Sequence, residues 1–433
     1  MNNEDSENIL EETDEYRYRA ILVAIKGSGT ADITPNESLD ELERLLHTDD
    51  GIALDRLIQN LDSAHPTHYI GRGKAEDLKV QAEALKANCI LFDDELSPRQ
   101  QSTLDELFGG NIRILDRTSL ILEIFAQHAT TKEGKLQVEL ATLEYQLPRL
   151  RGLWAHLEKE KLGGGVGARF GTGESQLETD RRLARKRIGE IKKQLALVRK
   201  DRLTQRQNRL SGSTFRVSLV GYTNAGKSSL LNALTGSDVL AYNKLFATLD
   251  STTRKLELPD KRVVTLTDTV GFIHKLPHQL VAAFRSTLDE VQDAQLLLHV
   301  VDASSDLREM MMTAVREVLE EIGAHTIPSV IVFNKIDQLS EVEISNLRNL
   351  YPGALLVSAV EHIGFDSLLQ RIITASTVDS VQMTVLIPYN KGHLLKMAHE
   401  STSIISKEFV DDGVLLNLLV PQSLVGYFEA HRQ

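Results

Sequence analysis

The stretch Gly221-Tyr-Thr-Asn-Ala-Gly-Lys-Ser228 constrains the fold of this 433-residue chain more than any other feature. It follows the run Phe215-Arg-Val-Ser-Leu-Val220, typical of a strand, and precedes Leu231-Asn-Ala-Leu234, typical of a helix. In this order the glycines let backbone N–H groups surround a phosphate, and the helix offers its positive N-terminal end. The pattern predicts a P-loop in an open α/β sheet of mostly parallel strands. Taken alone, the stretch has an alternative interpretation, a glycine turn that carries a lysine by chance.

Two side chains of this loop have specific expected tasks. The Lys227 ammonium would neutralise the β- and γ-phosphates of a nucleotide, and the Ser228 hydroxyl would bind Mg²⁺. The candidate nucleotide-binding residues of the loop are Gly221, Tyr222, Thr223, Asn224, Ala225, Gly226, Lys227 and Ser228.

Three further motifs follow, each after a strand-like run. Asp268-Thr-Val-Gly271 would place a carboxylate near Mg²⁺, through water, and the Gly271 N–H at the γ-phosphate. Asn334-Lys-Ile-Asp337 would select the base, because a carboxylate at Asp337 can accept both the ring N–H and the amine of guanine. Ser358, after a last strand, would support the base from the other side. Open α/β sheets bind ligands at the carboxyl ends of their strands, so the four motifs together predict a guanine-nucleotide site. Its downstream candidates are Asp268, Thr269, Val270, Gly271, Asn334, Lys335, Asp337, Ser358, Ala359 and Val360.

The order of these motifs resembles that of the translation-factor-related GTPases. The resemblance implies a switch segment between the P-loop and Asp268, and Phe246-Ala-Thr-Leu-Asp250 is similar to the switch sequence of that class. Thr248 is the Mg²⁺ ligand that the resemblance implies, with Thr252 and Thr253 as alternatives. The nucleotide-contact candidates of this segment are Phe246, Ala247, Thr248, Leu249 and Asp250.

The catalytic residues are fewer than in many signalling GTPases. Those enzymes carry a glutamine after Asp-x-x-Gly that orients the attacking water, whereas this chain has Phe272, which cannot hydrogen-bond through its side chain. We expect slow intrinsic hydrolysis, with a partner or an ion completing a catalytic set of Lys227, Gly271 and Asn224. In potassium-stimulated GTPases an asparagine at the position of Asn224 helps to hold K⁺. A side chain that only stabilises the turn is the alternative.

The charge distribution indicates one local contact with an anionic partner. A net charge of −12 disfavours general nucleic-acid binding, yet residues 181–209 contain twelve basic and two acidic side chains. A solvated helix face is the alternative interpretation of that segment. The N-terminus lacks a secretory pattern, and no apolar run reaches the ~18 residues of a membrane span. The single cysteine, Cys89, also fits a reducing compartment, so we expect a cytoplasmic protein without a membrane span. We also expect the protein to be monomeric.

The pattern of elements divides the chain into five segments. Strands expected at 18–24, 89–92 and 112–115 alternate with helices at 38–46 and 97–107, which predicts an N-terminal α/β domain. Two long helices, at about 132–162 and 174–209, flank a glycine-rich tip, and strands at 382–387 and 413–420 predict a small terminal module. The expected segments are an acidic tail at 1–17, the N-terminal domain at 18–127, a helical hairpin at 128–211, a GTPase domain at 212–376 and an α+β module at 377–433.

Motifs outside the nucleotide site make a second resemblance more specific. Residues 117–151, the tip Gly163-Gly-Gly-Val-Gly167, Tyr69-Ile-Gly-Arg-Gly-Lys74 and Leu91-Phe-Asp-Asp-Glu-Leu-Ser97 together resemble the HflX family of ribosome-associated GTPases. The resemblance implies binding to the large ribosomal subunit and its RNA, and GTP-dependent splitting, recycling or rescue of stalled ribosomes. Two alternatives stay open: a GTP-dependent switch acting on a non-ribosomal protein partner, and a potassium-stimulated GTPase in RNA modification.

The expected RNA contacts lie in the hairpin tip and the start of the second helix. The family's tip commonly reads G-G-x-G-x-R-G-P-G-E, whereas this chain has Phe170 added and Thr172 in place of the proline. The tip is therefore longer and less rigid, and Phe170 could stack on a base. The candidate RNA-contact residues are Gly164, Gly165, Gly167, Arg169, Phe170, Gly171, Gly173, Arg181, Arg182 and Arg185.

Overall fold

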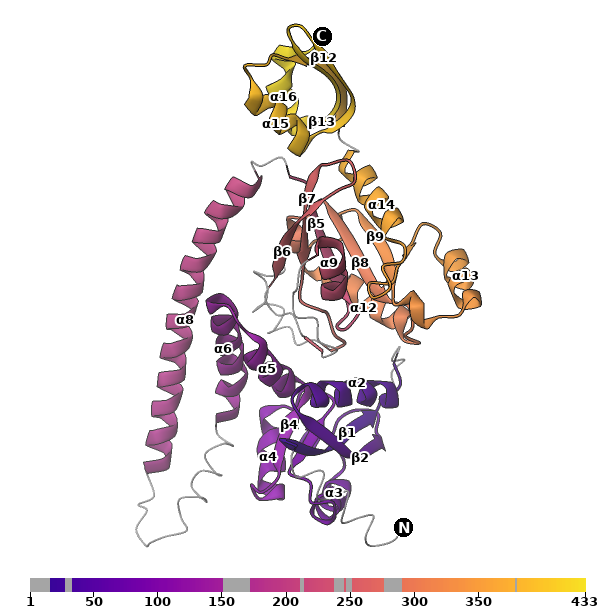
Figure 1. The fold of residues 1–433 in the computed structure, drawn as a ribbon. Coiled ribbons are helices and arrows are strands. Elements are labelled where there is room, and N and C mark those ends of the chain that lie inside the picture. The colour runs from indigo at the N-terminus through magenta and orange to yellow at the C-terminus, as the bar shows by residue number, and fades with distance from the viewer. Residues whose placement is uncertain are drawn as a thin grey trace. The chain divides into compact units, whose positions relative to one another are not determined.

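The computed structural model describes residues 16–27, 33–150, 172–210, 214–236, 245–246, 251–275, 290–377 and 380–433 (Figure 1). The chain divides into two compact units. The first unit comprises Met1–Val198, Lys244–Phe246 and Lys275–Phe284, and the second comprises Arg199–Asn243, Ala247–His274 and Arg285–Gln433. These units do not correspond one to one to the five segments expected from the sequence, whose boundaries stay predictions.

The first unit contains a parallel four-stranded sheet in the order β2-β1-β3-β4. The strands β1 and β3 lie in the middle and are almost entirely buried, which is why their apolar runs were visible in the sequence. The strand β2 was not predicted, because residues such as Asp55 and Arg56 interrupt its apolar pattern on an exposed stretch. The elements are β1 Tyr18–Lys26, α2 Pro35–Thr48, β2 Gly51–Asn60, α3 Arg72–Ala84, β3 Cys89–Phe92, α4 Pro98–Phe108, β4 Arg113–Asp116 and α5 Arg117–His128.

Local capping chemistry determines where two of these helices begin. Thr34 caps α2 and Ser97 caps α4, and in both helices the side-chain oxygen of a glutamate or glutamine three residues later accepts from the backbone N–H of the cap residue. A proline at the first position of each helix adds a fixed backbone angle that suits helix entry. The start of α4 agrees with the sequence prediction to within one residue, and α2 begins three residues earlier than predicted.

Two helices of the predicted hairpin are present in part. They are α6 Lys132–Gln146, followed by the 3₁₀ turn η1 Leu147–Arg149, and α8 Thr172–Leu210. Arg187 of α8 forms two bonds with Glu139 of α6, at 2.6 and 2.7 Å, and Lys192 lies 2.8 Å from Glu144. Part of the basic charge of α8 is therefore neutralised by α6. Residues 151–171, which include most of the predicted tip, lie outside the described part of the chain.

The second unit contains a six-stranded sheet in the order β10-β9-β8-β5-β7-β6. All neighbours are parallel except β6 and β7, so the predicted class, an α/β fold with a mostly parallel sheet, is confirmed. One core cluster joins the sheet to α9 and α14, and another joins it to α12 and α13. The elements are β5 Arg216–Gly221, α9 Lys227–Thr235, β6 Thr252–Glu257, β7 Val263–Asp268, β8 Leu296–Asp302, α12 Arg308–Glu321, β9 Ser329–Asn334, η2 Ile336–Gln338, α13 Glu341–Leu350, β10 Leu355–Leu356 and α14 Phe365–Thr377.

The C-terminal part of the second unit is a separate antiparallel sheet in the order β11-β13-β12 (Figure 1). The sequence predicted β11 and β13, whereas β12 was missed because most of its side chains are exposed and its pattern is polar. The elements are β11 Ser380–Ile387, α15 Gly392–Ser401, β12 Ser403–Val410, β13 Gly413–Pro421, η3 Gln422–Leu424, α16 Val425–Phe428 and η4 Glu429–His431. Among the residues searched, none of the helices is long and apolar enough to cross a membrane.

Candidate guanine-nucleotide site

The phosphate loop, residues 221–228, connects the central strand β5 to helix α9. A Cβ atom on Gly221 would lie 2.2 Å from the carbonyl oxygen of Val300, so only glycine fits beside the neighbouring strand. Gly226 has a φ of +88° and its Cβ would lie 2.2 Å from Nδ2 of Asn334. Both glycines of the motif are thus required by the backbone path. The loop is the strand, turn and helix that the sequence predicted.

Lys227 points back along the loop from the first turn of α9. Its Nζ donates to the carbonyls of Gly221 at 3.1 Å and Tyr222 at 2.8 Å, and the residue is 6% exposed. Burial lowers the pKa of Lys227 to about 8, and the nearby carboxylate of Asp268 opposes that shift. A phosphate group beside this ammonium would offset the cost of burying the charge.

Ser228, in the first turn of α9, and Asp268, the last residue of β7, lie side by side. The Ser228 hydroxyl donates to Oδ2 of Asp268 at 2.6 Å, and Asp268 is fully buried. Thr269, the residue after Asp268, is held against β5, because its Oγ1 donates to the carbonyl of Leu219 at 2.7 Å. A hydroxyl and a carboxylate are oxygen groups of the kind that Mg²⁺ and its bound water take in proteins, so these two residues fit the ion expected at this site. That Ser228 binds the ion directly and Asp268 acts through water stays a prediction.

Gly271 lies against the phosphate loop. A Cβ atom there would meet the Cα of Thr223 at 2.8 Å and Nζ of Lys227 at 3.0 Å, which leaves no room for a side chain. Phe272 follows and is 2% exposed. Its buried ring has no hydrogen-bonding group, which agrees with the expectation that another group must orient the water.

The two base motifs are joined to the phosphate loop through Asn334. Its Nδ2 donates to the carbonyl of Ala225, and its Oδ1 accepts from the N–H of Ala359, both at 3.0 Å. Ser358 donates to Oδ1 of Asp337 at 2.5 Å, which orients the carboxylate that would read guanine. The structure therefore brings the phosphate loop, the Asn334–Asp337 motif and Ser358–Ala359 to the same edge of the sheet. Val360, also a predicted site residue, is 73% exposed.

Asp302 is a residue that the sequence analysis missed. It ends β8, and its Oδ2 accepts from Nζ of Lys335 at 2.6 Å. Lys335 has a left-handed φ of +64°, a backbone conformation that lysine rarely adopts. The ion pair with Asp302 anchors the side chain of this residue of the base motif. Its position could have indicated it in the sequence, because Asp302 is the last residue of β8, the strand beside β9.

The predicted switch segment is described only at Phe246; Ala247, Thr248, Leu249 and Asp250 lie outside the described residues. Phe246 belongs to the first unit, where its ring packs edge-on against that of Phe125 at a centroid distance of 4.6 Å. Its contact with nucleotide stays a prediction. Thr252 and Thr253, the alternatives to Thr248, lie at the start of β6.

Lys275, four residues after Gly271, also belongs to the first unit. Its Nζ lies 2.6 Å from Oδ2 of Asp93 and 2.5 Å from Oδ1 of Asp94. Burial raises the pKa of Asp93, but Arg117 and Lys275 outweigh it and hold that pKa at about 2. No motif or spacing in the sequence indicates this ion pair.

Asn224 and the candidate RNA contacts can be placed only in part. Asn224 is exposed with a φ of +59°, a left-handed conformation that asparagine tolerates, which agrees with the turn-stabilising alternative. Its K⁺ role stays a prediction. Of the expected tip residues, Gly173 lies in the first turn of α8 rather than in a loop, and Gly164, Gly165, Gly167, Arg169, Phe170 and Gly171 lie outside the described residues. Arg182 and Arg185 are exposed on α8, and Arg181 is half-buried.

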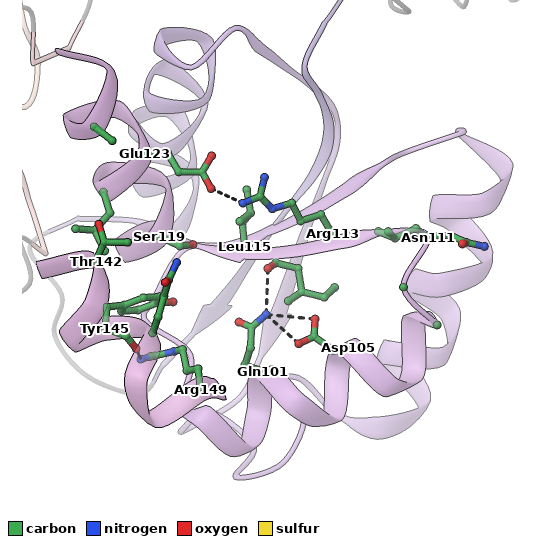
Figure 2. Close-up of a pocket in the computed structure, with 17 residues that line it drawn as sticks. Gln101, Asp105, Asn111, Arg113, Leu115, Ser119, Glu123, Thr142, Tyr145 and Arg149 are labelled. Carbon is green, nitrogen blue, oxygen red and sulfur yellow. Dashed lines mark hydrogen bonds and ion pairs between the residues drawn. The ribbon is translucent and has the colours of Figure 1, made fainter. Parts of the chain in front are cut away.

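The first unit has a cavity of its own, of about 640 Å³, beside the edge strand β4 (Figure 2). Figure 2 shows Arg113 reaching Glu123, a bond of 2.5 Å, and Gln101 lying between Asp105 and the backbone of β4. Arg149, at the other end, lies 3.0 Å from Glu95. The cationic groups of the rim are therefore neutralised within the unit.

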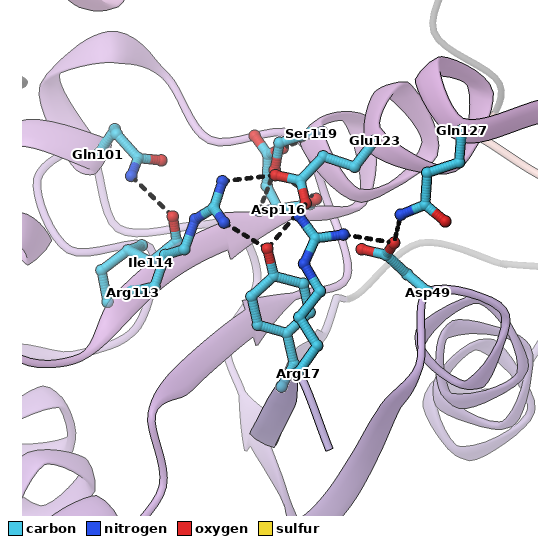
Figure 3. Close-up of polar contacts among 10 residues, drawn as sticks. Arg17, Asp49, Gln101, Arg113, Ile114, Asp116, Ser119, Glu123 and Gln127 are labelled. Carbon is cyan, nitrogen blue, oxygen red and sulfur yellow. Dashed lines mark hydrogen bonds and ion pairs between the residues drawn. The ribbon is translucent and has the colours of Figure 1, made fainter. Parts of the chain in front are cut away.

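A polar cluster beside this cavity holds a second buried carboxylate (Figure 3). Arg17 donates to Oδ1 of Asp49 at 2.8 Å, and Gln127 donates to the same oxygen. Burial raises the pKa of Asp49 to about 6 although Arg17 lies beside it. Asp49 is fully buried, whereas Arg17 and Arg113 of the same cluster are exposed, so the cluster connects the interior of the unit to its surface.

Comparison with known proteins agrees with the nucleotide site. Three family models match consecutive parts of the chain: a GTP-binding GTPase N-terminal region at residues 36–126, a GTP-binding GTPase middle region at 128–209, and a 50S ribosome-binding GTPase at 216–335. A GTPase HflX of Caldanaerobacter subterraneus subsp. tengcongensis is 45% identical over 405 residues, which cover 94% of this chain and 91% of that protein. The chain belongs to the HflX family of GTPases.

A further relative supports the same assignment of this HflX-family protein. GTPase HflX of Escherichia coli is 42% identical over 411 residues, 94% of each chain. Among solved structures, a complex of SsGBP with GDP is 25% identical, with a TM-score of 0.44 and coverage of 83% of this chain and 98% of that one. The family membership and the P-loop domain identify the protein as an enzyme that hydrolyses GTP, and as a GTPase it requires Mg²⁺.

Proposed function

We propose that this HflX-family GTPase binds the large ribosomal subunit through its RNA and uses GTP binding and hydrolysis to split, recycle or rescue stalled ribosomes. The observation that carries the proposal is the basic surface of α8 in an otherwise acidic protein. Arg187 and Lys192 are paired with α6, whereas Arg182 and Lys193 are exposed. Exposed cations on one helix supply the salt-dependent attraction that an RNA backbone requires.

Two further points support the ribosome as the partner. The family model that matches residues 216–335 describes a 50S ribosome-binding GTPase. Phe272 stands where many signalling GTPases carry a water-orienting glutamine, and its buried ring has no hydrogen-bonding group, so an activating partner has a chemical task to perform. In this proposal the protein acts as a monomer in the cytoplasm, where ribosomes are found.

The first experiment measures GTP hydrolysis by the purified protein in KCl buffer, alone and with large subunits or whole ribosomes. We expect a rise of about a hundredfold or more, towards the ~10³ to 10⁵ range that completing a GTPase site can supply. No change with ribosomes would contradict the proposal. Stimulation by K⁺ without a ribosome effect would favour the RNA-modification alternative, for which Asn224 is the supporting residue, and capture of one non-ribosomal protein would favour the protein switch.

A charge-reversal pair tests the role of α8. Arg182→Glu should weaken binding to large subunits and reduce the slope of log affinity against log salt by about one, because one phosphate contact is lost. Arg371→Glu is the matched control, an exposed arginine on helix α14 of the second unit. Equal effects of the two variants would show that net charge, rather than this helix, determines the binding.

A further inference from the structure

A short segment after the Asp268 motif, residues 271–274, is fastened to the phosphate loop; we call it the strap. The Phe272 N–H donates to the carbonyl of Gly221 at 3.1 Å, and the Phe272 carbonyl accepts from the N–H of Thr223 at 2.8 Å. Tyr222 and Phe272 are therefore paired like neighbours in a parallel sheet. Both backbone groups of Phe272 are used in this pairing.

A side chain makes the third link between the strap and the loop. The hydroxyl oxygen of Tyr222 accepts from the backbone N–H of His274 at 2.5 Å. Tyr222 is 3% exposed, and Phe272 and Ile273 are each 2% exposed. A hydrogen bond between a buried phenol oxygen and this backbone N–H fixes the far end of the strap.

The same tyrosine also contacts the lysine of the loop. Its backbone carbonyl accepts from Nζ of Lys227 at 2.8 Å, while its side chain holds His274. Gly271, at the near end of the strap, is so close to Lys227 that a Cβ atom would lie 3.0 Å from Nζ. The position of the Gly271 N–H relative to the Lys227 ammonium therefore depends on how firmly the strap lies on the loop.

We propose that Tyr222 is a positioning residue for GTP hydrolysis: its hydroxyl holds the strap on the phosphate loop and thereby sets Gly271 beside Lys227. The γ-phosphate is the group that an N–H at Gly271 and an ammonium at Lys227 would hold together. GDP lacks that phosphate. The contribution of Tyr222 is thus specific to the triphosphate and to its transition state, and it compensates in part for a Phe272 side chain that cannot orient water.

The test compares Tyr222→Phe with the wild-type full-length protein, because phenylalanine keeps the ring and removes only the hydroxyl. We measure kcat and KM for GTP, and the Kd of GDP and of a non-hydrolysable GTP analogue. The loss of one buried hydrogen bond should lower kcat and the affinity for the analogue about three- to tenfold, and leave the affinity for GDP at its wild-type value. Tyr389→Phe is the matched control, since the Tyr389 hydroxyl donates to the carbonyl of Val410 in the C-terminal sheet.

A second variant removes the same bond from the donor side. His274→Pro lacks the N–H, and because both changes remove the Tyr222–His274 hydrogen bond, the double variant should lower kcat by less than the product of the two single losses. An unchanged kcat in Tyr222→Phe would overturn the proposal. Equal losses of affinity for GDP and for the analogue would also overturn it, because they would show that Tyr222 shapes the loop as a whole.

Discussion

Replacing Gly226 by alanine tests how the phosphate loop and the base motif depend on each other. Gly226 caps the start of α9 with a φ of +88°, and an added Cβ would lie 2.2 Å from Nδ2 of Asn334. That nitrogen donates to the carbonyl of Ala225, and Oδ1 of Asn334 accepts from the backbone N–H of Ala359. The new methyl group must therefore displace the residue that connects the loop to the guanine motif.

The magnitude follows from two terms. A left-handed conformation costs a residue other than glycine about 1 to 2 kcal/mol. Losing the two hydrogen bonds of Asn334 adds about 1 kcal/mol each, so the total destabilisation should be about 3 to 4 kcal/mol. Because Asn334 then no longer supports the base site, nucleotide affinity should fall on the order of tenfold or more, equally for GDP and GTP.

Gly236→Ala provides a matched control at the other end of the same helix. Gly236 has a φ of +64°, and a Cβ atom there would meet nothing within 4 Å. This variant carries the conformational cost of about 1 to 2 kcal/mol without the collision, and its nucleotide affinity should be unchanged. Urea unfolding and titration with a fluorescent GDP measure both quantities. If the two variants lose the same stability, or if Gly226→Ala binds GDP like the wild type, the reasoning from Asn334 is wrong.

Three other expectations concern charge and base recognition. Burial lowers the pKa of Lys227 to about 8 and a bound phosphate favours the charged form, so affinity for GDP should fall as the pH rises above about 8; a flat titration from about pH 7 to about pH 9 would contradict this. Arg117 and Lys275 overcome the effect of burial and hold the pKa of Asp93 at about 2, below the ordinary value, so its ion pairs stabilise the fold above about pH 4. That contribution, about 2 kcal/mol, should be lost as the pH falls from about 4 to about 2 in urea unfolding of the wild type but not of Asp93→Asn. Asp337→Asn should weaken GDP binding roughly 30- to 150-fold and improve binding of xanthosine diphosphate, whose ring N–H and carbonyl match an amide; equal loss for both nucleotides in competition assays would argue against direct reading of the base.

The sequence alone determined the parts of the site that depend on local backbone. The G-x-x-x-x-G-K-S spacing located Gly221 and Gly226, and the mostly apolar run before them predicted the buried strand that β5 is. The motifs at Asp268 and Asn334 could be located for the same reason, since each follows a buried strand. A polar, exposed strand such as β12 carries no such pattern and was missed.

Only the tertiary structure decided which side chains support these motifs. Lys335 contacts Asp302, 33 residues away in the sequence. His274 contacts Tyr222 at a separation of 52 residues, and Lys275 contacts Asp93 at a separation of 182. Such pairs follow from how strands and loops pack, and a single sequence holds no periodicity or spacing that would reveal them. Short motifs in the sequence therefore predict which residues form the nucleotide site, whereas the packing of distant segments determines the contacts that hold those motifs in place.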